Sequence, residues 1–194
     1  MKRARYVTSK TFHGRAFKRA AVAFIFAAVL CPGAAPARTR VPQEEVMDTA
    51  RTPAGELTLV RRREGEAVTV VIKLDGRVVA EKTASREGDA YESASFAGLY
   101  PRTAPRYALV GFSTGALVCG AKFTVVDLSR EGAAKATEDF GNCSDAPRAS
   151  YRRGVLTVAF PAGPGKHDPG SHYVGPGQVW SYGNGRLRRI GGRR

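Results

Sequence analysis

The sequence has no long hydrophobic run. Its main apolar stretch, residues 20–30, is eleven residues long, whereas a helix needs about 20 apolar residues to cross a bilayer. A basic segment without acidic residues precedes this stretch, and small residues up to Ala35-Pro36-Ala37 follow it. That order is typical of a secretory signal peptide. We therefore predict a signal peptide over residues 1–37, a mature chain that begins at Arg38, no membrane-spanning segment after processing, and a periplasmic or secreted location.

Cysteine is scarce, and its three positions are informative. Cys31 lies within the predicted signal peptide, so processing leaves Cys119 and Cys143. Two cysteines in an oxidising compartment indicate a disulfide; the alternative is a pair of unbonded buried thiols. A bridge between these two residues closes a loop of 24 residues, which stabilises the fold by roughly 3 kcal/mol on the loop-entropy account.

Acidic residues are absent from both ends of the chain. Because seven of the 31 basic residues and none of the 17 acids precede residue 38, the mature net charge is +7 rather than +14. No acid follows Asp168, yet several arginines do, and guanidinium groups bind phosphate and carboxylate groups. The candidate binding residues are Trp180, Tyr182, Arg186, Arg188 and Arg189. The alternative is an edge hairpin that its charges protect from pairing with other sheets.

Helix signals are weak throughout the chain. The best candidate, residues 129–138, is interrupted by Gly132 and lacks an apolar stripe. Short runs with strand-like alternation recur instead, separated by Gly and Pro. Residues 117–125, for example, alternate from Leu117 through Cys119 and Phe123 to Val125 on one face. We therefore predict a linker or N-terminal arm over residues 38–54 and one all-β domain over residues 55–194, an antiparallel sandwich or barrel built from hairpins with one disulfide.

Three turn signals predict two-residue hairpins and fix their registers. They are Asp75-Gly76, Arg153-Gly154 and Asn184-Gly185, and type I′ turns favour such pairs because both turn residues need positive φ. The predicted cross-strand pairs are Leu74–Arg77, Ile72–Val79, Tyr151–Leu156, Ala149–Val158, Ser150–Thr157, Tyr182–Leu187 and Trp180–Arg189.

One motif has the form of a catalytic site. Residues 111–115 match G-x-S-x-G, in which a strand-to-helix turn exposes a nucleophilic serine, here Ser113. The later acids and histidines that satisfy the order of a triad are Asp127, Asp139, Asp145, His167 and His172. A β-rich run follows the serine where the motif requires a helix, so an ordinary turn is the favoured interpretation. A serine hydrolase remains the alternative function.

The loop that contains His167, Asp168 and His172 holds groups that can bind a metal ion, but four prolines and five glycines surround them. A metal site needs its ligands on rigid elements. We interpret this segment as a solvated loop, and we predict no metal and no cofactor.

Four segments resemble those of uncharacterised small exported proteins of Gram-negative bacteria. They are STGALVCGAKFTVVDL, EDFGNCSD, GVLTVAFP and WSYGNGRL, within residues 106–190. The chain departs from that group at Leu117-Val118, where a polar approach to the first cysteine is expected. The resemblance implies a periplasmic location and a β-rich fold with two cysteines, and implies no activity. The sequence thus favours an exported, non-catalytic envelope protein that binds a partner protein or an anionic polymer, and not nucleic acid.

Overall fold

A computed structural model describes residues 42–83, 91–114, 119–129, 133–163 and 174–192 of the protein, and these residues contain no helix. The strands are β1 (Gln43–Thr52), β2 (Gly55–Glu64), β3 (Ala67–Leu74), β4 (Arg77–Thr83), β5 (Ser93–Tyr100), β6 (Tyr107–Ser113), β7 (Ala121–Asp127), β8 (Lys135–Ala136), β9 (Arg148–Arg152), β10 (Val155–Phe160), β11 (Gln178–Gly183) and β12 (Arg186–Gly191). In the described ranges, no helix is long and apolar enough to cross a membrane.

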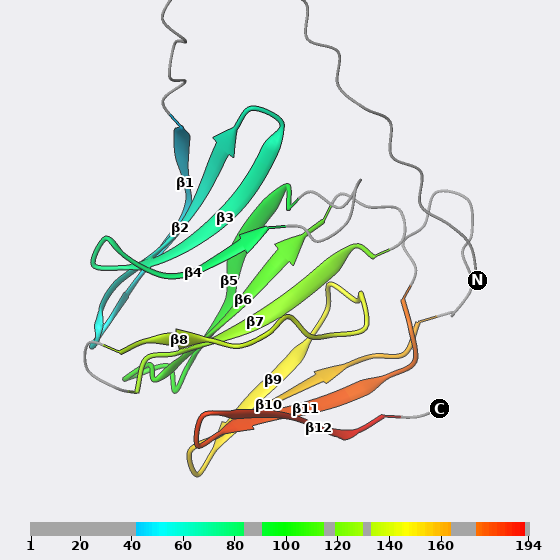
Figure 1. Ribbon diagram of the computed structural model, residues 1–194. Coiled ribbons are helices and arrows are strands. Elements are labelled where there is room, and N and C mark those ends of the chain that lie inside the picture. The colour runs from blue at the N-terminus through cyan, green and yellow to red at the C-terminus, as the bar shows by residue number, and fades with distance from the viewer. Residues whose placement is uncertain (1–41, 84–90, 115–118, 130–132, 164–173, 193–194) are drawn as a thin grey trace, which may run out of the picture. The chain divides into compact units, whose positions relative to one another are not determined.

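The strands pair antiparallel into three sheets of four (Figure 1). Sheet A has the order β1-β2-β3-β4, sheet B the order β5-β6-β7-β8, and sheet C the order β12-β11-β10-β9. The all-β, antiparallel prediction is confirmed. The prediction of a single sandwich or barrel is not confirmed, because the strands form three separate sheets. Residues 129–138 form no helix where they are described; they contribute the short strand β8.

Sheet A begins earlier in the chain than the sequence pattern indicates. That pattern assigns residues 38–54 to a linker, but residues 43–52 form β1 and pair with β2 along its whole length. The sequence of β1, QEEVMDTART, has too few apolar residues to show an alternation. Strand formation here depends on the neighbouring strand more than on intrinsic preference.

All three predicted hairpin turns form. Their first residues have φ values of 47°, 48° and 51°, and the glycines that follow have φ values of 76°, 83° and 73°, as type I′ turns require. The pairs predicted across the second and third turns are observed: Tyr151–Leu156, Ala149–Val158, Ser150–Thr157, Tyr182–Leu187 and Trp180–Arg189. Local turn chemistry therefore determines the register of both hairpins in sheet C.

One predicted pair in sheet A is wrong by one residue. Leu74 pairs with Arg77 as expected, but Ile72 pairs with Ala80 rather than Val79. A β-bulge causes the shift, since it inserts one extra residue into β4. The side chain of Val79 still packs against the apolar cluster between sheets A and B.

The central strands of sheet B, β6 and β7, are buried on both faces along most of their length. In β6, Ala108, Val110 and Phe112 belong to an apolar cluster that sheet A completes, whereas Tyr107 and Leu109 belong to a second cluster that sheet C completes. Alternate residues of a strand point to opposite faces, so sheet B lies between the other two sheets (Figure 1). An uninterrupted apolar strand is what such a two-sided environment requires.

Two cross-links hold sheet C against sheet B. The predicted disulfide between Cys119 and Cys143 is present, and it joins the chain just before β7 to the segment that leads into β9. The phenol of Tyr182 donates a hydrogen bond to Asp127 Oδ2 at 2.8 Å, from β11 to the end of β7. Tyr182 also belongs to the aromatic cluster between the two sheets, so its hydrogen bond lies beside their shared core.

A buried asparagine secures the segment next to the disulfide. The side chain of Asn142 is 4% exposed, and its Nδ2 lies 2.7 Å from the Pro161 carbonyl and 3.1 Å from the Pro176 carbonyl. Its Oδ1 accepts the backbone N–H of Ser144. Because a buried amide without partners is costly, these bonds determine how the chain enters and leaves sheet C.

A carboxylate holds sheet A against the edge of sheet B. Asp48 Oδ2 accepts the backbone N–H of Phe96 at 2.9 Å, and its other oxygen accepts the N–H of Thr49. Both β1 and β5 carry a β-bulge at this point. The bulges direct an otherwise unpaired N–H of an edge strand towards a side chain of the other sheet.

Candidate functional site

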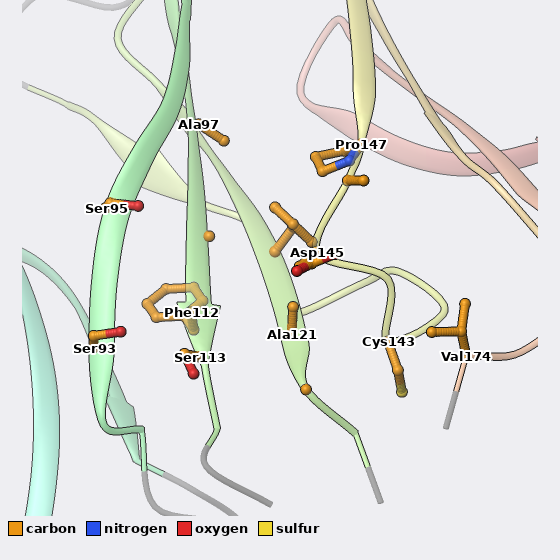
Figure 2. Close-up of a pocket in the computed structure, with 14 residues that line it drawn as sticks. Ser93, Ser95, Ala97, Phe112, Ser113, Ala121, Cys143, Asp145, Pro147 and Val174 are labelled. Carbon is orange, nitrogen blue, oxygen red and sulfur yellow. The ribbon is translucent and has the colours of Figure 1, made fainter. Parts of the chain in front are cut away.

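Two surfaces among the described residues are candidate sites. The first is a groove at the edge of sheet B. It encloses about 610 Å³, and we call it the serine groove. Its main lining residues are Ser93, Ser95, Ala97, Gly111, Ser113, Ala121, Phe123, Asp145 and Pro147. In Figure 2, the hydroxyls of Ser93 and Ser95 lie along one strand, and Asp145 lies on the wall across from them.

Small residues keep the serine groove open. Gly111 pairs with Phe123 on β7, and a Cβ at Gly111 would lie 2.9 Å from the ring of Phe123. The glycine therefore lets the aromatic ring lie across β6, where any side chain would displace it. The floor of the groove consists of this ring and of short side chains on β5, β6 and β7.

Ser113 lies in this groove, but not on a nucleophile elbow. It is the last residue of β6, which is antiparallel to both of its neighbours, whereas the elbow requires a strand of a parallel sheet followed by a helix. All three histidines of the chain, His13, His167 and His172, lie outside the described residues. Asp168 and Gly115, which complete the predicted loop and the motif, lie outside them too.

The three candidate acids have different surroundings. Asp127 accepts hydrogen bonds from Tyr182 and from Ser129, and Asp139 binds Lys82 Nζ at 2.7 Å and the Tyr91 hydroxyl at 2.6 Å. Both carboxylates therefore hold the fold together. Asp145 is the candidate that lines the serine groove with Ser113.

The second surface is the outer face of sheet C, which we call the arginine face. The inward residues of this sheet pack in the aromatic cluster against sheet B, so the residues between them point outward. On β9 these are Arg148, Ser150 and Arg152, and on β12 they include Arg186 and Arg188. All five are exposed. The arginines thus stand on the two edge strands.

Small residues cover the two strands between these arginines. The outward residues of β10 and β11 are Val155, Thr157, Ala159, Val179, Ser181 and Gly183. Above Gly183 the face is hollowed, with a volume of about 380 Å³, and Arg186 and Arg188 line this hollow. The arginine face is therefore a strip of small residues between two edges that carry arginines; we call this strip the trough, and its hollow lies on the β12 side.

The arginine face has no acidic residue. The strands of sheet C contain neither Asp nor Glu. All five ion pairs found among the described residues involve sheet A instead. The guanidinium groups of Arg148, Arg152, Arg186 and Arg188 are therefore not paired with any described carboxylate. Such groups are available to anions from outside the chain.

The predicted binding residues fall on different sides of sheet C. Arg186 and Arg188 are on the arginine face. Tyr182 is 4% exposed and packs edge-on against Tyr107, with ring centroids 5.3 Å apart. Trp180 also points inward, where its ring lies 5.4 Å from that of Phe140. The two aromatic residues belong to the core between sheets B and C.

Arg189 differs from the other two arginines of β12. It pairs with Trp180, on the inward side of the edge strand, and its guanidinium lies against Gly192, where a Cβ would be 2.8 Å from Nη2. The other two arginines of the arginine face are Arg148 and Arg152 on β9. Sequence reasoning missed these two because they lie on the other hairpin, which only the pairing of β10 with β11 brings near β12.

No family model, curated protein or solved structure matches the chain. The function must therefore be argued from the two surfaces themselves. Within the described ranges, no group of three His, Cys, Asp or Glu side chains is arranged to hold a metal ion.

Proposed function

We propose that the protein is a non-catalytic binding protein that holds an anionic polymer, or an acidic partner in the cell envelope, on the arginine face. One observation carries the proposal: four exposed arginines flank a trough without acids, and none has a described carboxylate partner. Arginine binds phosphate, sulfate and carboxylate groups in a bidentate manner. The trough is open and shallow, as binding of an extended molecule requires.

The arginines of the two edge strands stand too far apart to bind one small anion together. Four strands at a spacing of about 4.8 Å place β9 and β12 roughly 14 Å apart. Along β12, Arg186 and Arg188 are two residues apart, or about 6.7 Å. An extended ligand with several charges matches this layout. Because the groups are exposed, we expect binding to weaken as salt rises and screens charges beyond about 10 Å at 0.1 M.

The test measures binding of the purified mature protein to dextran sulfate, with neutral dextran of the same length as the reference. The variant Arg186→Ser/Arg188→Ser removes two charges from the arginine face. Arg63→Ser/Arg77→Ser removes two exposed charges from sheet A and is the matched control. We expect the first variant to bind dextran sulfate at least about tenfold more weakly, a loss of roughly 1.4 kcal/mol, and the control to bind nearly as wild type does.

Two results contradict the proposal. If both double variants lose affinity equally, the net charge of the protein drives binding and the arginine face has no special role. If wild type binds neutral dextran as well as dextran sulfate, charge is not what the protein recognises. Unchanged melting temperatures show that either result concerns binding, since surface substitutions usually alter stability by less than about 0.5 kcal/mol.

Export of the protein belongs to the same proposal. The basic segment, short apolar run and Ala35-Pro36-Ala37 of the sequence support a signal peptide that ends at residue 37. The disulfide fits a compartment that is oxidising. The intact mass of protein recovered from a periplasmic fraction should correspond to a chain that begins at Arg38. Recovery of the full-length chain there contradicts the proposed processing.

A serine hydrolase is the alternative, and one observation favours it: Ser113 and Asp145 line the same groove of about 610 Å³. A fluorophosphonate probe labels activated serines. Labelling of wild type that disappears in Ser113→Ala, and persists in Ser95→Ala from the same groove, would support this alternative. Absence of labelling in wild type would leave the binding function as the proposal.

A further inference from the structure

We infer that the ligand of the arginine face is an acidic polysaccharide, an inference that rests on the binding function proposed above. The side chains of this face fall into rows that cross the strands at right angles. One row is charged at its two ends and another is made of hydroxyl groups. Together they match a chain whose acidic groups alternate with uncharged, hydroxyl-bearing units.

The hydroxyl row comes from three successive strands. Ser150 on β9 pairs with Thr157 on β10, Thr157 pairs with Ser181 on β11, and Ser181 pairs with Arg188 on β12. Directly paired residues of neighbouring antiparallel strands lie on the same face. Three hydroxyls therefore stand in line, about 4.8 Å apart, and a guanidinium ends the line.

The charged groups lie at the ends of the neighbouring rows. On one side of the hydroxyl row, Arg152 ends β9 and pairs with Val155, while Arg186 pairs with Gly183 at the far edge. On the other side Arg148 pairs with Ala159. Positive charge is thus confined to the two edges of the sheet. The middle of the face offers uncharged groups only.

Hydroxyl groups in the middle of the face favour a sugar over a polyphosphate. Ser and Thr hydroxyls both donate and accept hydrogen bonds, as the hydroxyls of a sugar do. A polyphosphate carries a negative charge on every unit and has no donors. Its central charges would lie over the hydroxyl row, where they would meet hydroxyl donors but no guanidinium, so they would gain less than charges paired with arginine.

The absence of exposed aromatic rings on this face argues against nucleic acid and against a protein partner. All the aromatic residues of sheet C pack in the cluster against sheet B, whereas single-stranded nucleic acids stack their bases on exposed rings. Protein interfaces depend on buried aromatic and arginine anchors in pockets. The exposed large apolar side chains on the strands of sheet C are Val155 on β10, at 39%, and Ile190 on the edge strand β12, at 60%.

The experiment compares two polyanions with the intact mature protein. Hyaluronan carries one carboxylate on every second sugar, and polyphosphate carries a charge on every unit. The variant Ser150→Ala/Thr157→Val/Ser181→Ala removes the hydroxyl row and keeps every arginine. We expect its affinity for hyaluronan to fall about three- to tenfold while its affinity for polyphosphate changes less than twofold.

A matched control removes hydroxyls from the outer face of sheet A, through Thr49→Ala/Thr58→Val. This variant should bind hyaluronan as wild type does. If the triple variant loses affinity for both polymers equally, or for neither, the polysaccharide inference is wrong while the proposed binding function stands. If wild type binds polyphosphate or single-stranded DNA more tightly than hyaluronan, the inference also fails. If wild type binds no polyanion, the proposed function itself fails.

Discussion

Sheet A and sheet C both carry many basic residues, but their charges have different surroundings. The strands of sheet A contain seven basic and six acidic residues, and the strands of sheet C contain five basic residues and no acid. On sheet A, Arg62 binds Glu81 at 2.8 Å and Lys73 binds Glu44 at 2.8 Å. On sheet C, the arginines of the outer face form no ion pair with a described carboxylate.

The charged side chains of the two sheets also lie beside different kinds of residue. Val60 and Val71 point to the outer face of sheet A and are 4% and 0% exposed, and the paired residues Arg62 and Lys73 are their neighbours on that face. Long charged side chains can cover apolar groups with their aliphatic stems. The hydrogen bond with Glu81 raises the pKa of Arg62 above its usual value. Paired charges that cover apolar groups contribute to the fold. Unpaired arginines over small polar residues contribute little to it, which is why we assign the arginine face to binding.

Removal of the disulfide should have the largest effect and should separate the two sheets most clearly. The variant Cys119→Ser/Cys143→Ser should lose about 3 kcal/mol of unfolding free energy, since a loop of 24 residues is released in the unfolded chain. Chemical denaturation measures the loss. Because the bridge ties the start of β7 to the segment that leads into sheet C, hydrogen exchange in sheet C should increase more than in sheet A. Equal increases in the two sheets would contradict this account of the bridge.

Asp48 links sheet A to sheet B, as the disulfide links sheet B to the segment that leads into sheet C. Asp48→Ala should cost about 2 kcal/mol, because hydrogen bonds to a charged acceptor contribute roughly 1.5–3 kcal/mol and the Phe96 N–H loses its partner. Asp48→Asn keeps an acceptor and should cost less. Faster hydrogen exchange should be confined to β1 and β5. An Asn variant as unstable as the Ala variant would mean that the contact depends on something other than its hydrogen bonds.

A double-mutant cycle on Lys73 and Glu44 should give a smaller effect. Exposed ion pairs are worth about 0.2–1 kcal/mol, so we expect a coupling energy of about 0.5 kcal/mol that declines as salt is added. Arg188→Ser, the comparison on sheet C, should leave the melting temperature unchanged at any salt concentration. A clear loss of stability in Arg188→Ser would indicate that the arginine face also serves the fold.

The smallest expected effect is a change in how the stability of the protein declines at alkaline pH. Burial raises the pKa of the Tyr107 phenol, with a further contribution from the charge of Asp127. A phenol whose pKa is raised by folding stabilises the protein fully below its unfolded pKa of about 10, and this contribution is lost as pH rises through the folded pKa. Tyr107→Phe should show a weaker decline of stability above pH 10. An identical decline in both proteins would assign the effect to other tyrosines.

The features that the sequence predicted correctly depend on local residue patterns or on the number of cysteines. Type I′ turns gave the registers of both hairpins in sheet C, and the cysteine count gave the disulfide. The bulge that shifts Val79 was not predictable, because it depends on how β4 packs against sheet B. The strand β1 was missed because its charged residues show no pattern until β2 pairs with them.

The number of sheets depends on information that local patterns do not contain. Alternation shows that Leu57 and Leu59 are buried, but not against which sheet. The apolar run of β6 was the available sign of a strand covered on both faces. Likewise, Arg186 and Arg188 could be recognised from a stretch without acids. They could be grouped with Arg148 and Arg152 only from the pairing of β10 with β11, two strands that residues 161–177 separate in the chain.

The order of the sheets along the chain also bears on how the protein reaches its native state. Each sheet is formed by consecutive strands, so most pairings are local and should form early, as low contact order implies. Sheet B, however, is not completed by sheet A, because Leu109, Phe123 and Val125 belong to the cluster that Phe140 and sheet C complete. During folding this apolar face is open to other chains, and aggregation competes with the arrival of the last four strands. Sheet C therefore protects the folding chain by covering this apolar face.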